Sequence, residues 1–349
     1  MIESSQKDPS FFINQQTIFL SRESFMYRIG VDFGGTKISC AITDDNYSIL
    51  TKVSCQTKAH RPADEITADI AELCRKAAVA VSVSLSDIES IGIGIPGAID
   101  PAIGTVEYSC NLPTYVSYPI VSKMKELTGV KSIFIDNDAN AAALGEAVAG
   151  AAKGSSSSVM ITLGTGVGGG VIINGKILSG FNGAAGELGH MVIKHGGVPC
   201  PCGRHGCFEA YCSATSLVRM TKERLCQLIA DKKPSFMLEM CENDPSKANT
   251  RTAFDASKKG DGEACRLINE YMSYLACGIT NLINAYQPEV FTIGGGLSGE
   301  GEYLLGPLLP LIEREQYTRT YPKSRQTKIK IATLGNDAGL IGAAALGAM

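Results

Sequence analysis

Two glycine-rich turns restrict the fold of this chain more than any other feature of its sequence. The sequence DFGGTK at residues 32–37 separates two short apolar runs, and LGTGVGGG at residues 163–170 separates two more. Successive backbone N–H groups in such turns can surround a phosphate, and threonine hydroxyls add donors. Either turn alone could be an ordinary hairpin, but two of them, with a third glycine cluster at residues 294–299, favour a nucleotide site. Neither has the spacing of a P-loop or a Rossmann fingerprint, so a nucleotide site of another kind is predicted.

Strand-like and helix-like patterns alternate along the chain, which predicts an α/β fold. The second strand–glycine turn–strand unit echoes the first, and this repeat predicts two lobes that face each other across a cleft. The polar stretch at residues 231–252 is predicted to be a surface excursion. The predicted strands are 29–33, 36–42, 49–57, 91–95, 133–135, 159–163, 171–173 and 290–293, and the predicted helices are 63–84, 139–149, 262–286 and 337–349.

Length and composition narrow the class of protein. A chain of 349 residues is too long for one ordinary core and sufficient for two lobes. A formal net charge of −3 gives no electrostatic reason to expect a nucleic-acid or anionic-membrane partner. No apolar run approaches the roughly 18 residues that span a bilayer, and the chain does not begin with a secretory signal. We therefore expect a cytoplasmic protein that binds neither nucleic acid nor membrane.

Regular patterning begins at Tyr27, directly after Met26. Residues 1–26 are therefore predicted to be a leader, either disordered or the result of a start assigned too far upstream.

Four of the twelve cysteines crowd into residues 200–212, whereas the other eight are scattered singly, as expected of buried thiols in a reducing compartment. Three of the four lie within eight residues, in CPCGRHGC at 200–207. A disulfide is a poor explanation, because a Cys-x-Cys pair is strained and a third thiol is left over. A structural zinc ion needs four soft ligands. Cys200, Cys202 and Cys207 supply three, and the spacing leaves His190, His195, His205 and Cys212 open as the fourth.

Three polar residues, Asp136, Asn137 and Asp138, separate a predicted strand from an alanine-rich helix. The carboxyl end of a strand at the start of a helix is a usual ligand-facing position in α/β folds. An aspartate there is favoured in its ionised form by the helix dipole and could accept a hydroxyl proton. Any of the three could instead cap the helix, and spacing alone does not choose among them.

Seven motifs in this order resemble the ROK family of repressors and sugar kinases, most closely its bacterial-type glucokinases. The resemblance covers roughly residues 27–349. It implies the two-lobed actin-like ATPase (ribonuclease H-like) fold, with residues 27–134 and 331–349 in a smaller α/β lobe and residues 135–330, including a zinc loop at 190–207, in a larger one. The motifs are VDFGGTK at 31–37, GIPGAID at 94–100, NDANAAALGE at 137–146, LGTGVGGG at 163–170, GAAGELGH at 183–190, CPCGRHGCFE at 200–209 and IGGGLS at 293–298.

The resemblance assigns roles that the spacing left open. It implies that Asp138 is the catalytic base and that His190 is the fourth zinc ligand. His190 would then bind zinc through one ring nitrogen and offer the other to a sugar hydroxyl. The residues implied to bind the sugar are Gly97, Asn111, Asn137, Asp138, Glu187, His190 and Glu209.

The same resemblance implies a nucleotide site for ATP, with adenosine near residues 294–298. Asp32 would bind the accompanying Mg²⁺, directly or through water, although it could simply stabilise its turn. The residues implied to bind the nucleotide are Asp32, Gly34, Gly35, Thr36, Lys37, Gly164, Thr165, Gly166, Gly168, Gly295 and Gly296.

These assignments predict an ATP-dependent hexose kinase, with glucose as the expected substrate and a homodimer as the family-level expectation. Kinases for fructose, mannose, N-acetylmannosamine and N-acetylglucosamine share every motif quoted. A sugar-sensing repressor would carry a winged helix-turn-helix ahead of the first glycine turn, where fewer than 30 residues precede Ile29. A zinc-stabilised binding protein without catalysis would leave the glycine turns unexplained.

Overall fold

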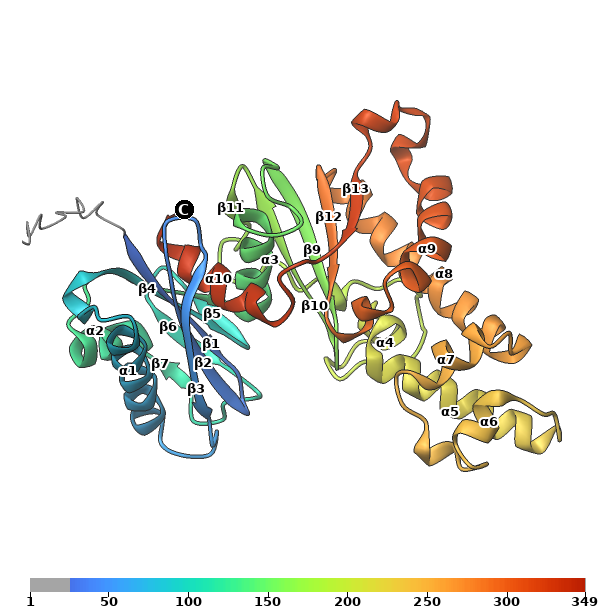
Figure 1. Cartoon of the computed structure of the whole chain (residues 1–349). Helices are drawn as coiled ribbons and strands as arrows, with labels where there is room; N and C mark the ends of the chain where they lie inside the picture. Colours follow the sequence, from blue (N-terminus) through green and yellow to red (C-terminus); the bar gives the residue numbers. More distant parts are fainter. Residues whose placement is uncertain (1–25, 349) are drawn as a thin grey trace, which may run out of the picture.

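Two five-stranded sheets with the same strand order form the framework of the computed structural model, which describes residues 26–348 (Figure 1). In each sheet the first three strands along the chain pair antiparallel, in sequence order. The fourth strand then pairs parallel with the first, and the fifth pairs parallel with the fourth. The repeat expected from the two glycine turns therefore extends to the order of all five strands. Apart from Met26, the predicted leader lies outside the described residues.

The first sheet has the order β3-β2-β1-β4-β8, and the second has the order β11-β10-β9-β12-β13. The bounds of the first are β1 Tyr27–Phe33, β2 Lys37–Thr43, β3 Ile49–Gln56, β4 Ile88–Ile95 and β8 Ile133–Asn137. Those of the second are β9 Ser157–Leu163, β10 Val167–Ile173, β11 Lys176–Ile177, β12 Val290–Gly294 and β13 Lys328–Ile331. A small sheet beside the first consists of β5 Ala98–Asp100, β6 Thr105–Tyr108 and β7 Val116–Tyr118.

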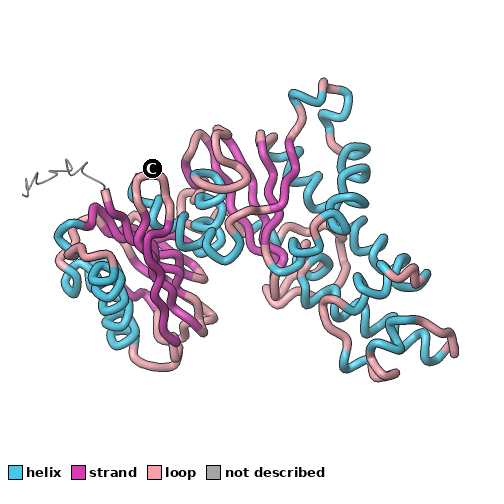
Figure 2. Tube along the Cα trace, in the orientation of Figure 1, coloured by secondary structure: helices cyan, strands magenta, loops and turns pink. Residues whose placement is uncertain are grey.

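The helices cover both faces of each sheet. On one face of the first sheet, α1 (Ala63–Ala80) and α2 (Ile120–Thr128) cover the strands, and α10 (Ala338–Ala345) packs against β1 and β4 on the other. Between the two sheets, α10 contacts α3 (Asp138–Val148), which in turn packs on β9 and β10 (Figure 1). Along the chain, the remaining helices lie between β11 and β13 of the second sheet, and they form a largely helical region beside it (Figure 2). They are α4 Glu209–Cys212, α5 Ala214–Ala230, α6 Phe236–Met240, α7 Thr252–Lys258, α8 Gly262–Tyr286 and α9 Glu302–Glu315.

Two hydrophobic cores lie on the outer faces of the sheets. Alternate residues of β9 point to opposite sides: Ile161 joins the core that contains α8, whereas Met160 joins the small cluster beneath α3. In the first sheet Ile29 packs with Ile66 of α1. None of the helices within residues 26–348 is long and apolar enough to cross a membrane.

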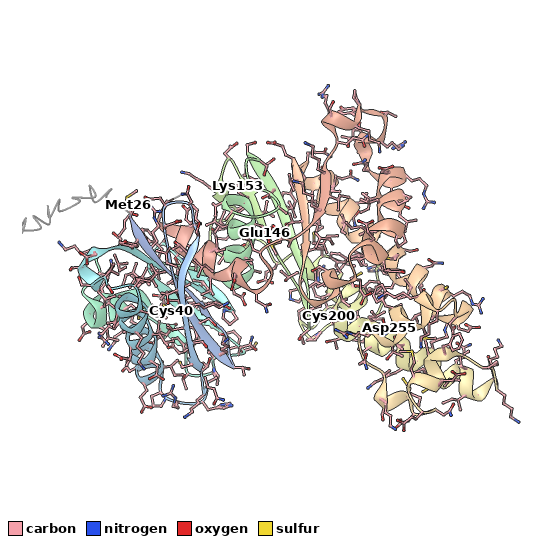
Figure 3. All side chains as sticks on the ribbon, viewed as in Figure 1. Met26, Cys40, Glu146, Lys153, Cys200 and Asp255 are labelled. Carbon is pink, nitrogen blue, oxygen red and sulfur yellow. The ribbon has the colours of Figure 1, made fainter. Side chains whose placement is uncertain are left out.

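A buried carboxylate fixes the segment that returns from the second sheet to the first. Glu146, at the far end of α3 from Asp138, lies between the sheets and is fully buried (Figure 3). Its oxygens accept the backbone N–H groups of Ala151 at 2.7 Å and Leu334 at 2.8 Å, and that of Thr333 at 3.2 Å. Because these bonds join α3 to the β13–α10 connection, Glu146 helps to set how the two sheets sit together.

The structure corrects three details of the prediction. Helix α1 ends at Ala80 rather than residue 84, because Ser82 has a positive φ of 58° and the N–H groups of Val81 and Val83 both close onto Ala78 O. The polar stretch at 231–252 is not merely a surface excursion, since Met237 in α6 is fully buried in the second core.

The third detail is the division between lobes. Strand β8 pairs with β4 from Ile133 through Asn137, so a boundary between residues 134 and 135 would cut a strand of the first sheet. The boundary between residues 330 and 331 likewise cuts the end of β13. We propose that the smaller lobe instead contains residues 27–137 and 332–348.

The α3–α10 contact predicts a large stability loss from a small substitution. A Cβ on Gly342 would lie 1.6 Å from Ala141 O, so Gly342→Ala must separate the helices. We expect the free energy of unfolding to fall by about 2 kcal/mol or more, as in overpacked cores, and urea titration would measure it. Gly339→Ala in the same helix is the control, because its Cβ would meet Asp32 side-chain atoms no closer than 3.7 Å. Equal losses in both variants would contradict this account.

Candidate active site

A cleft of about 940 Å³ opens between the glycine turns of the two sheets. It receives residues from the carboxyl end of β1, the start of α3, the second glycine turn and the segment before α10. Every predicted sugar-binding residue lines it, namely Gly97, Asn111, Asn137, Asp138, Glu187, His190 and Glu209. The predicted nucleotide residues that line it are Asp32, Lys37, Gly164, Thr165, Gly166 and Gly168.

Five predicted nucleotide residues, Gly34, Gly35, Thr36, Gly295 and Gly296, are not among the lining residues of this cleft. Gly34 closes the first turn by donating its N–H to Lys37 O at 3.0 Å. Gly295 has a φ of 82°, and a Cβ there would lie 2.5 Å from Leu163 N, at the start of the second turn. Both glycines therefore let the backbone close around the turns. Their contact with a nucleotide, and an adenosine position near 294–298, stay predictions.

The three polar residues before α3 have different partners. Asn137 is the helix cap: its Oδ1 accepts the N–H of Ala139 at 2.9 Å and that of Asn140 at 3.4 Å. Its Nδ2 donates to Gly97 O at 3.3 Å, which leaves one amide hydrogen for a ligand. Asp136 is buried and accepts from Asn137 N and Asn140 Nδ2.

Asp138 is half-buried at the cleft, and its carboxylate is bound only by backbone groups. Its Oδ1 accepts the N–H of Ala139 at 2.9 Å, and no side chain within residues 26–348 donates a hydrogen bond to either carboxylate oxygen. Burial raises the pKa of Asp138 above its ordinary value of 3.8, and the negative charge of Glu187 raises it further, against backbone hydrogen bonds that lower it. Of the three residues, Asp138 is thus the one placed to take a proton from a bound molecule.

Asp32, at the carboxyl end of β1, adds a second carboxylate on the same sheet, close enough to Asp138 for its charge to be felt. Burial raises the pKa of Asp32, the charge of Asp138 raises it too, and the ammonium groups of Lys52 and Lys37 act against both. A buried carboxylate beside a second negative charge favours a cation next to it, and carboxylate oxygens suit Mg²⁺. The donor set therefore fits the magnesium ion expected with ATP.

Glu187, His190 and Glu209 lie where the zinc loop meets the second glycine turn. Glu209 Oε2 accepts the N–H of Val167 at 2.9 Å, so this carboxylate holds the turn as well as lining the cleft. His190 places Nδ1 3.6 Å from Cys200 Sγ and Nε2 4.0 Å from Glu187 Oε2. One ring nitrogen thus faces the cysteines and the other faces the cleft carboxylates.

His190, Cys200, Cys202 and Cys207 form a compact metal-ligand cluster, with one ligand atom of each within 4.8 Å of the others. A tetrahedron with Zn–S bonds of about 2.3 Å and a Zn–N bond of about 2.1 Å has edges of about 3.8 Å between sulfurs and about 3.6 Å from sulfur to nitrogen. The Cys202–Cys207 Sγ distance is 3.7 Å and the Cys200 Sγ–His190 Nδ1 distance is 3.6 Å. The geometry fits zinc and brings together His190 rather than the other fourth-ligand candidates, His195, His205 and Cys212.

Several lining residues escaped the sequence analysis: Ser39, Lys52, Asn336 and Gly339. Ser39 and Lys52 belong to β2 and β3, where the alternation of side chains could have indicated a shared face. Asn336 and Gly339 reach the cleft only because the chain returns from the second sheet to the first, and no local pattern reports that return.

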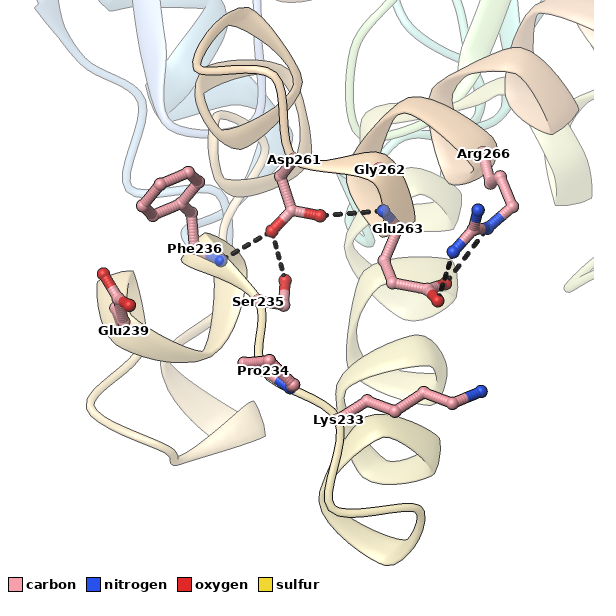
Figure 4. A pocket seen from close by; sticks show the side chains of 9 residues that line it. All are labelled: Lys233, Pro234, Ser235, Phe236, Glu239, Asp261, Gly262, Glu263 and Arg266. Carbon is pink, nitrogen blue, oxygen red and sulfur yellow. Dashed lines mark hydrogen bonds and ion pairs between the residues drawn. The ribbon is translucent and has the colours of Figure 1, made fainter.

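A second pocket of about 460 Å³ lies away from the cleft, between α6 and the start of α8 (Figure 4). Asp261, Glu263 and Arg266 of this pocket already have partners. Asp261 accepts from Ser235 Oγ at 2.6 Å and from Glu263 N at 2.8 Å, and Glu263 pairs with Arg266 and Arg224. These bonds stabilise the start of α8 and leave few donors and acceptors of these residues available to a ligand.

The fold and the cleft place the chain among the two-lobed actin-like ATPases, as predicted. A ROK hexokinase from Thermus thermophilus matches with a TM-score of 0.75 and 34% identity, over 91% of this chain and 97% of that one. A ROK family glucokinase from Streptomyces griseus, solved in complex with glucose and AMPPNP, matches with a TM-score of 0.72 and 32% identity over 92% and 98%. The glucokinase of Halalkalibacterium halodurans is 38% identical over 318 residues, 90% of this chain and 92% of the relative. The family model described as the ROK family matches residues 28–348, and this chain belongs to the ROK family.

Proposed function

We propose that this protein is an ATP-dependent hexokinase that converts glucose to glucose 6-phosphate. The observation that carries the proposal is the Asp138 carboxylate, which lines the cleft and receives no hydrogen bond from a side chain within residues 26–348. The named glucokinase relative and the solved complex with glucose and AMPPNP support the same activity. Another hexose or an N-acetylhexosamine is the alternative substrate, because discrimination depends on hydrogen bonds to individual hydroxyls.

The sugar side of the cleft supplies binding and one proton acceptor. Asn111, Glu187, His190 and Glu209 border the space in front of Asp138 and offer amide, carboxylate and imidazole groups to sugar hydroxyls. Asp138 accepts the proton of the reacting hydroxyl while that oxygen attacks the terminal phosphorus of ATP. The bond from this phosphorus to the bridging oxygen breaks, and ADP leaves. The burial that raises the pKa of Asp138 also makes it a stronger base than an exposed aspartate.

The nucleotide side supplies positioning and charge. The second glycine turn presents backbone N–H groups to the phosphates, and Lys37 of the first turn adds a positive charge. Asp32 is the residue that would hold Mg²⁺, directly or through water, and Mg²⁺ when bound offsets phosphate charge. Closure of the two lobes would exclude water from the reacting groups.

Zinc is proposed to be structural. Held by Cys200, Cys202, Cys207 and His190, it would orient His190 through Nδ1 and leave Nε2 facing the cleft. The residues in the cleft, and not this cluster, carry the chemistry.

A cytoplasmic location and a homodimer also remain proposals. All twelve cysteines are free, which suits a reducing compartment. The homodimer is carried from the family resemblance, and the absence of a nucleic-acid partner is carried from the net charge of −3.

A coupled ADP-release assay tests the function. We expect strong turnover with ATP, Mg²⁺ and glucose and none without sugar, in a panel that includes fructose, mannose, N-acetylmannosamine and N-acetylglucosamine. Turnover with an acetylated sugar alone would keep the mechanism and change the substrate. Folded, zinc-loaded protein that turns over no sugar would refute the kinase.

A further inference from the structure

The cleft is short of positive charge for a nucleotide site. Its lining residues within the described chain include four carboxylates, Asp32, Asp138, Glu187 and Glu209, but only two lysines and no arginine. A nucleoside triphosphate adds several negative charges, of which one Mg²⁺ neutralises only part. Both lysines are therefore needed near the phosphates. Lys37 belongs to the first glycine turn, but Lys52 belongs to no motif.

Strand register places Lys52 on the same face of the first sheet as Asp32. Ala41 in β2 lies opposite both Gly30 in β1 and Lys52 in β3, so these three residues share a face. Asp32 is two residues along from Gly30 and points the same way. A Cβ on Gly30 would lie 1.9 Å from Leu340 O of α10, which identifies this face as the one beside the cleft.

Electrostatics agree with this placement. The charge of Lys52 lowers the pKa of Asp32, with an effect ahead of that of Lys37. Lys52 is thus near Asp32, the carboxylate that would hold Mg²⁺. Ser39 lies opposite Asp32 in the sheet, with Lys37 on one side of it and Lys52 on the other.

Lys52 forms an ion pair in this structure that can be broken at little cost in free energy. Its ammonium pairs with Asp337, which lies just before α10. The Lys52 side chain is 38% exposed and that of Asp337 is 41% exposed. An ion pair so exposed to water contributes little stability, so exchanging the carboxylate for a phosphate costs little.

On the basis of the proposed kinase function, we propose that Lys52 binds the terminal phosphates of ATP. It exchanges the Asp337 carboxylate for phosphate oxygens when the nucleotide enters the cleft. Lys52 is then a nucleotide-binding residue supplied by the third strand, outside both glycine turns.

Steady-state kinetics with varied ATP at saturating sugar separate this role from a structural one. Lys52→Met keeps the aliphatic stem and removes the charge. It is expected to raise KM for ATP about tenfold and to leave KM for sugar within about twofold, as for loss of one charge-assisted contact. Asp337→Asn breaks the same ion pair but keeps the ammonium, so KM for ATP should stay unchanged or fall. Lys52→Arg keeps the charge and should restore most of the nucleotide affinity.

Two results would overturn the proposal: an unchanged KM for ATP in Lys52→Met, or equal increases in Lys52→Met and Asp337→Asn, which would mark the ion pair itself as the functional element. Calorimetric binding of AMPPNP to the folded wild type and to Lys52→Met tests the contact without turnover. Wild-type protein that binds AMPPNP more tightly than Lys52→Met, yet phosphorylates no sugar, would reject the kinase and retain Lys52 as a nucleotide ligand. Equal AMPPNP affinities would reject the Lys52 contact whatever the activity.

Discussion

Asp138→Asn is expected to lower kcat for sugar phosphorylation by about a thousandfold, within the range for loss of a general base. The asparagine keeps the shape of the side chain, and its carbonyl oxygen can still accept the N–H of Ala139, which Asp138 accepts at 2.9 Å. The cap of α3 is Asn137 and is not touched by the change. Sugar binding should therefore be largely retained, and calorimetry with glucose would measure it beside the turnover assay.

Retained turnover in folded Asp138→Asn would remove Asp138 from the role of base. Loss of turnover together with loss of glucose binding would instead indicate that the residue mainly holds the sugar. The thermal midpoint of the variant should stay close to that of the wild type, since Asp138 forms no side-chain hydrogen bond within residues 26–348 that the change would remove.

The pH profile gives an independent readout of the same residue. The base acts in its ionised form, and its pKa is raised above 3.8 by burial and by the charge of Glu187. Activity is therefore lost as the pH falls through this raised pKa, at a higher pH than an ordinary aspartate would give. Glu187→Gln removes the second of these causes, so the acid limb of kcat/KM should move to lower pH, even though KM for sugar rises.

Local sequence patterns were sufficient to predict those elements whose caps, apolar periodicity or residue spacing lie within the element itself. Helix α8 has its predicted bounds, because Asp261 caps its start and an apolar stripe runs along its length. The two glycine turns indicated the hairpins on either side of the cleft. The spacing of Cys200, Cys202 and Cys207 indicated a metal cluster, because three thiols so close have few other uses.

Contacts between segments that are distant along the chain could not be predicted from local sequence patterns. Spacing alone left the fourth ligand open, the family resemblance implied His190, and the fold brings His190 next to Cys200. The cap of α3 was open among three adjacent residues, since each can accept a backbone N–H, and only the backbone geometry selects Asn137. Lys52 joined the cleft through the register of β2 and β3, and Asn336 joined it through the return of the chain to α10. Each depends on pairing between segments, which no local periodicity encodes.

Removal of the zinc ligands is expected to weaken sugar binding more than nucleotide binding. Cys207→Ser takes one thiolate from the four-ligand cluster, and the bound metal should fall from about one ion per chain toward zero, as measured by elemental analysis. His190 then loses the contact that orients its ring. Glu209, two residues after Cys207, loses the anchored loop from which it holds Val167 N. KM for glucose should rise at least about tenfold, the usual scale for loss of groups that orient metal-bound ligands.

The first glycine turn lies on the other sheet and should not respond to zinc loss, so the affinity for AMPPNP should fall less than the affinity for glucose. Cys226→Ser is the matched control, because Cys226 is an exposed thiol on α5 outside the cluster. It should retain both the metal and the wild-type KM for glucose. A folded Cys207→Ser protein that lacks metal yet keeps the wild-type KM for glucose would contradict the coupling between the cluster and the sugar site. The zinc would then act only on the stability of residues 190–207, and the orientation of His190 would have to come from Glu187 and the surrounding backbone alone.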